Sequence, residues 1–130
     1  MKIAIAVTRF LLGLGFAVFG ANIIHPFMPQ PPMSGLPLQF MTVMGPTHWM
    51  TLVGAFQLVG GLLVLAGGTA PLGLALLAPV LVNILAFHTL LMGGEGIAPG
   101  AVFTVLELFL LYAYRGYFAP LLTTGAKPAA

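Results

Sequence analysis

Apolar residues fall into four long blocks, separated by short stretches rich in proline, glycine or polar residues. The blocks cover residues 3–24, 47–66, 72–92 and 98–118. Each is close to the roughly 20 residues that an α-helix needs to cross about 30 Å of hydrocarbon. None alternates apolar and polar positions, as a strand of a membrane β-barrel would. The pattern predicts an all-α integral membrane four-helix bundle, running up-down-up-down, as one domain of residues 1–130.

Proline and glycine mark the ends and irregularities of these helices. Pro71 suits the first turn of the third helix. Pro79 lies inside that helix, where its ring removes a backbone hydrogen bond, so we expect a kink there. The longest connection, residues 25–45, is rich in proline and begins as an extended segment. Within it, residues 38–44 form either a short interfacial helix or a coil.

The first block has two interpretations. Lys2 and Arg9 before an apolar run resemble the start of a secretory signal peptide. The apolar residues continue on both sides of Arg9, however, and they are numerous enough to span a membrane. We therefore expect an uncleaved first span.

Composition supports lipid as the solvent of this chain. It is 60% hydrophobic and 5% charged, whereas a soluble domain is about 25% charged. The absence of cysteine excludes disulfides, thiol catalysis and iron–sulfur ligation. All basic residues stand toward the two chain ends and form no patch for nucleic acid: Lys2, Arg9, Arg115 and Lys127. The positive-inside rule then predicts both termini in the cytoplasm and residues 25–45 outside.

Each predicted helix carries one polar residue at membrane depth. Small or polar residues share a helix face with Arg9, with Gln57 and with Glu107, so we expect these three faces to point into the bundle. We also expect Arg9 and Glu107 to form an ion pair, with the other two supplying hydrogen bonds. The cluster either fixes helix packing or serves proton, quinone or substrate chemistry. Its members are Arg9, Gln57, Asn83 and Glu107.

A second set of candidates lies near the outer ends of the helices: His25, His48, His88 and Glu95. Imidazole and carboxylate groups ligate metals, and histidine also binds haem or chlorophyll. The spacing matches no known ligand motif, and hydrogen-bonded interfacial histidines are the ordinary case. We therefore predict no metal and no resident cofactor, with contact to a quinone, haem or chlorophyll as the alternative.

Four segments carry a resemblance to a known family. They are RFLLGLGFAVFGAN, GAFQLVGGLLVLAG, APLGLALLAPVLVNILAFH and LELFLLYAYRGYFAPLL. In order and spacing the chain resembles the DoxX family of small four-helix bacterial membrane proteins, whose early arginine matches Arg9. It departs at Asn22, near where the family has lysine, and at Gln57, where many members are acidic. The resemblance implies a four-helix bundle in a bacterial cytoplasmic (inner) membrane. Some relatives are linked to thiosulfate:quinone oxidoreductase and others to membrane redox-stress complexes.

The function predicted from these features is that of a non-catalytic accessory subunit of a larger membrane redox, respiratory or photosynthetic complex. Its partners would be the lipid bilayer and other membrane subunits, or a second copy of the chain, and no nucleic acid. The alternative is a membrane subunit of a quinone-linked oxidoreductase, or a small-molecule carrier. That alternative would use Arg9, Gln57 and Glu107.

Overall fold

The computed structural model describes residues 1–129, and within them it is all-α, without strands. Four long helices form the body, as the sequence predicts, and shorter helical pieces lie at its ends. The elements are α1 (Lys2–Ile24), α2 (Gly35–Met44), α3 (Trp49–Ala66), α4 (Ala70–Ala86), the π-helical turn η1 (Phe87–Leu91), α5 (Ala98–Ala113), α6 (Arg115–Phe118) and the 3-10 turn η2 (Ala119–Leu122).

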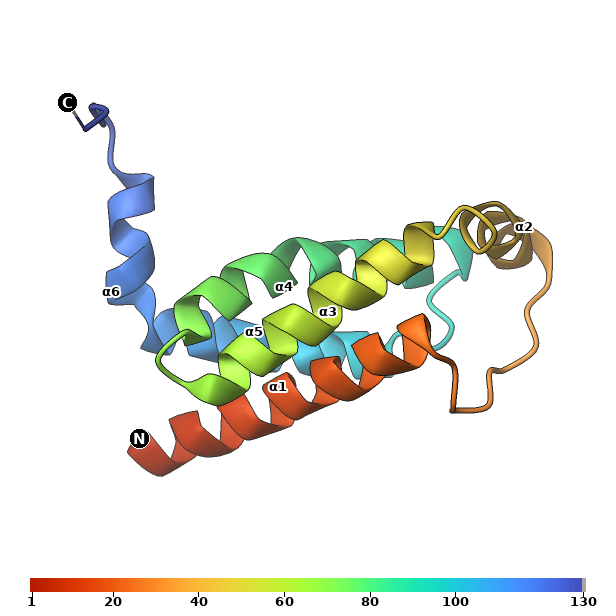
Figure 1. The fold of residues 1–130 in the computed structure, drawn as a ribbon, viewed down its shortest axis with the longest axis horizontal. Helices are drawn as coiled ribbons and strands as arrows, with labels where there is room; N and C mark the ends of the chain where they lie inside the picture. The colour runs from red at the N-terminus through yellow and green to blue at the C-terminus, as the bar shows by residue number, and fades with distance from the viewer. Residues whose placement is uncertain (130) are drawn as a thin grey trace.

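The long helices α1, α3, α4 and α5 run back and forth along one direction (Figure 1). The N-terminus and α6 lie at one end of this bundle, and α2 lies at the other. Three helical segments are long and apolar enough to cross a membrane: α1, α3, and α4 continued by η1. A fourth crossing is available if α5 and the bent piece that follows it are counted together. These helices indicate a multi-pass membrane protein.

Glycine residues let α3 touch both α1 and α4 through its backbone. A Cβ atom added at Gly61 would lie 2.6 Å from the backbone oxygen of Gly13 and 2.6 Å from the backbone nitrogen of Ala17. On the α4 side, a Cβ at Gly73 would lie 2.7 Å from the backbone oxygen of Gly60. The predicted stripe of small residues on α1 therefore faces the bundle interior. Close approach of this kind maximises van der Waals contact between helices in lipid.

Helix α5 packs by side chains instead. The ring of Phe103 lies 5.1 Å from that of Phe16 and 5.9 Å from that of Phe19, centroid to centroid. It also covers Gly15, where a Cβ would collide with the ring. The apolar core between these helices consists of Leu12, Phe16, Val64, Leu74, Leu77, Leu81 and Leu110.

The predicted fourth span, residues 98–118, is not one straight helix. α5 ends at Ala113, and residues 115–122 continue at an angle of 77° to it. At the bend, Arg115 Nη1 donates a hydrogen bond to the backbone oxygen of Tyr112. That side chain satisfies a last-turn carbonyl that a continuing helix would otherwise pair.

The long connection after α1 contains a helix, so the helical alternative for residues 38–44 is confirmed and extends back to Gly35. Phe40 of α2 packs edge-on against Phe87 of η1, with ring centroids 5.5 Å apart. Pro79 lies inside α4, and the irregular turn η1 follows it further along. The kink at Pro79 stays a prediction.

Candidate functional site

Arg9 of α1 caps the C-terminal end of α3. Its Nε donates to the backbone oxygen of Val64 at 3.2 Å, and its Nη2 donates to that of Leu65 at 3.3 Å. The last carbonyls of a helix have no partner within it and carry the negative end of the helix dipole. Gly67 follows with a positive φ of 82°, and a Cβ there would lie 2.8 Å from the guanidinium. The glycine thus leaves room for Arg9 at the end of α3.

Glu107 of α5 is buried, with 3% of its surface exposed. Within residues 1–129 neither of its carboxyl oxygens has a hydrogen-bond partner. The predicted ion pair between Arg9 and Glu107 is therefore wrong. Arg9 has acceptors on the adjacent helix α3 instead, where two backbone carbonyls satisfy it.

The two amides of the predicted cluster, Gln57 and Asn83, differ in burial. Gln57 is buried, at 3% exposure, and its backbone lies against Gly20 of α1. Asn83 is exposed on α4, and its Nδ2 donates to the backbone oxygen of Pro79 at 2.8 Å. The expectation that Asn83 supplies a hydrogen bond to Arg9 and Glu107 is wrong, because its amide bonds to its own helix and Glu107 has no partner in the described part of the chain. Leu81 faces the core, and two residues further turn the side chain by about 200° around the helix.

A buried amide that the sequence analysis did not select lies at the end of α1. Asn22 is 5% exposed, and its Oδ1 accepts hydrogen bonds from the backbone N–H groups of Phe27 and Met28, at 2.9 and 2.8 Å. These bonds fix the chain reversal that follows the helix. An asparagine three residues before a His-Pro pair signals such a role, because its side chain readily bonds nearby backbone.

The four candidate ligands near the outer ends of the helices, His25, His48, His88 and Glu95, do not form one cluster. His25 and His48 are exposed at the ends of α1 and α3, and His48 adopts a left-handed conformation with φ of 58°. His88 lies in η1 with its Nδ1 2.9 Å from the backbone oxygen of Glu95, whose side chain is exposed. Across residues 1–129, no three His, Asp or Glu side chains converge on a point that could hold a metal.

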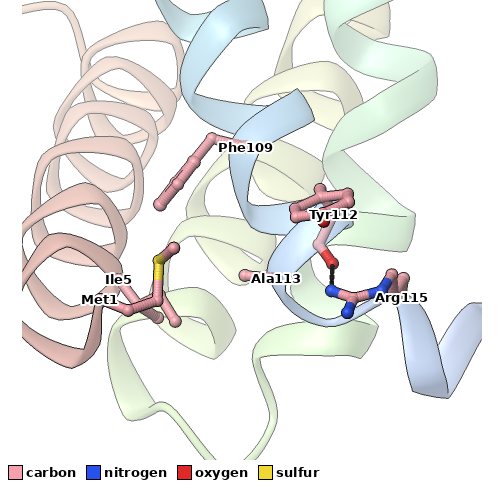
Figure 2. A pocket seen from close by; sticks show the side chains of 6 residues that line it. All are labelled: Met1, Ile5, Phe109, Tyr112, Ala113 and Arg115. Carbon is pink, nitrogen blue, oxygen red and sulfur yellow. Dashed lines mark hydrogen bonds between the residues drawn. The ribbon is translucent and has the colours of Figure 1, made fainter.

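Two shallow grooves lie at opposite ends of the bundle. The first, of about 240 Å³, is formed by α1, α5 and the start of α6 (Figure 2). The second, of about 250 Å³, lies between residues 32–37 and the stretch containing Leu91, Met92 and Glu95. Neither is lined by Arg9 or Glu107. The buried carboxyl thus stands apart from both grooves.

The all-α fold and the three to four long apolar helices within residues 1–129 indicate a multi-pass helical membrane protein. No family model, curated protein or solved structure matches the chain. The resemblance to the DoxX family stays a prediction.

Proposed function

We propose that this chain is a DoxX-like accessory subunit of a larger redox, respiratory or photosynthetic complex in a bacterial cytoplasmic membrane. In this proposal both termini are cytoplasmic, and the subunit acts by docking against a helix of a partner protein. The observation that carries the proposal is the exposed amide of Asn83 on the outward face of α4.

A carboxamide facing hydrocarbon is costly, because lipid offers it no hydrogen-bond partner. The Asn83 amide donates once to its own helix, and it has a second N–H and an oxygen to offer. Ala75 and Pro79 are exposed on the same side of α4. Their small size allows another transmembrane helix to come close enough to use the amide.

Photo-crosslinking in native membranes tests this docking. The reactive residue is placed at Val82, beside Asn83, and for the control at Val105 of α5; each valine is 65% exposed. We expect a crosslink to one partner polypeptide from position 82. This crosslink should be lost in Asn83→Leu, and position 105 should not give it. Lipid adducts alone at both positions would contradict the proposal. Native purification through a tag on this chain would then identify the partner.

A second candidate function is favoured by Glu107. Transmembrane acids with no partner are functional-site candidates, because the bilayer interior penalises them. In this alternative the carboxyl exchanges a proton or hydrogen bond with a quinone or small polar substrate. Labelling by a hydrophobic carbodiimide, which attacks carboxyl groups inside membranes, would test whether Glu107 is reachable. Protection by added quinone supports the alternative, and labelling that quinone leaves unchanged opposes it.

A further inference from the structure

The groove between α1 and α5 combines an apolar wall with a cationic rim. Its wall includes Ile5 from α1 and Phe109 and Ala113 from α5, and Arg115 stands at its edge (Figure 2). At about 240 Å³ the groove is too small for a whole lipid, but it can receive the part of one acyl chain that lies next to the glycerol ester.

The guanidinium of Arg115 is held in place by its own helix turn. Nη1 donates to the backbone oxygen of Tyr112 at 2.9 Å, and the guanidinium carbon lies 4.4 Å from the centre of the Tyr112 ring. A guanidinium has five N–H donors in a planar fork that matches phosphate oxygens. Most of these donors therefore remain available at the rim of the groove.

The surrounding charges and geometry place this rim at a membrane surface. Lys2 is exposed at the start of α1, at the same end of the bundle. The two acidic residues lie elsewhere, Glu95 in the loop at the opposite end and Glu107 in the interior. Residues 115–122 run at 77° to α5, as a segment lying along the interface would. This end of the bundle is therefore positive, and we expect it to lie at the depth of the lipid headgroups.

We propose that this groove binds an anionic phospholipid. The lipid phosphate accepts hydrogen bonds from the Arg115 guanidinium. The part of one acyl chain nearest the headgroup packs against Ile5 and Phe109. Basic groups beside transmembrane helices attract anionic lipids with about 1 kcal/mol per Lys or Arg, which corresponds to about fivefold in affinity. The apolar wall adds the hydrophobic contact that a free phosphate ion cannot make.

Native mass spectrometry of the full chain in detergent tests the site, with phosphatidylglycerol, phosphatidylcholine and inorganic phosphate as the added probes. We expect phosphatidylglycerol to bind more tightly than phosphatidylcholine. Arg115→Gln should weaken phosphatidylglycerol binding about fivefold. The control Lys127→Gln removes the same charge from the C-terminal tail and should leave binding unchanged.

A second variant separates the site from effects on folding. Ala113→Phe fills the groove but keeps Arg115, and it should also weaken phosphatidylglycerol binding while the melting temperature in lipid-free detergent stays within a few degrees. Equal binding of both lipids, or unchanged binding in both Arg115→Gln and Ala113→Phe, would overturn the proposal. Displacement of bound phosphatidylglycerol by equimolar inorganic phosphate would also overturn it, because it would reveal a simple anion site.

Discussion

Glu107 illustrates at the scale of one residue how a buried group can lower stability. Its carboxyl is 3% exposed and, within residues 1–129, makes no hydrogen bond. Desolvating a polar group without a partner costs free energy that an apolar side chain of similar size does not. A residue kept at such a cost is a candidate for a role outside stability.

Replacing this residue measures that cost. We expect Glu107→Leu to raise the free energy of unfolding in detergent by about 1–3 kcal/mol, because the penalty for burying an unsatisfied group is removed. Glu107→Gln, the control, keeps a buried polar group of the same shape and should gain much less. A Leu variant that unfolds at a lower temperature than the parent would mean that the carboxyl has a stabilising partner.

Arg9 makes the opposite contribution. Its two hydrogen bonds close the end of α3, so we expect Arg9→Leu to lower the free energy of unfolding by about 1.5–3 kcal/mol. Because Arg9 and Glu107 share no partner, the double variant Arg9→Leu/Glu107→Leu should equal the sum of the singles within about 0.5 kcal/mol. Thermal unfolding of all four proteins in one detergent measures the cycle. A coupling energy clearly above about 0.5 kcal/mol would mean that Arg9 and Glu107 do form an ion pair.

At the scale of elements, the close contact between α1 and α3 depends on glycines, which have no Cβ atom. A Cβ at Gly61 would lie 2.6 Å from backbone atoms of α1, which cannot rotate away as a side chain can. We expect Gly61→Ala to push the helices apart and to lower the free energy of unfolding by about 1–3 kcal/mol. Gly116→Ala is the matched control, because nothing lies within 4 Å of its added Cβ. Equal stability of the two variants would mean that this contact adds nothing.

The sequence predicts these small-residue faces correctly because they depend on local features. Gly13, Gly20, Gly54 and Gly61 recur at helical spacing, and spacing alone decides which residues share a face. The partner of Arg9 could not be found in this way. It is a pair of backbone carbonyls, which every helix end offers and no residue type marks.

The position of Asn83 was predictable in principle. Leu74, Leu77 and Leu81 form a stripe at intervals of three and four on α4, and Asn83 falls outside that stripe. The bend after α5 was harder to predict from the sequence. Arg115 and Gly116 stand at the bend, but a single arginine near the end of a membrane span is common, and its contact with the Tyr112 carbonyl forms only in three dimensions.

At the scale of the whole molecule, two kinds of packing are combined. α1, α3 and α4 meet through glycine and backbone, whereas α5 is joined to them by aromatic and aliphatic side chains. Interfaces of the first kind resist change in either helix, and interfaces of the second kind adjust by altered rotamers. The buried Glu107 and the proposed lipid groove both involve α5, the helix that packs by side chains.

The proposed docking at Asn83 and the proposed lipid site both assume one arrangement, which is four membrane crossings with both chain ends in the cytoplasm. Because the chain has no native cysteine, only an introduced cysteine in it can react with a maleimide. Cysteines are placed one at a time at Gln30, Gly68, Glu95 and Lys127, and intact spheroplasts are treated with a membrane-impermeant maleimide. We expect positions 30 and 95 to react from outside, and 68 and 127 to react only after permeabilisation. Labelling of position 127 in intact spheroplasts, or of 30 and 68 from the same side, would contradict the arrangement.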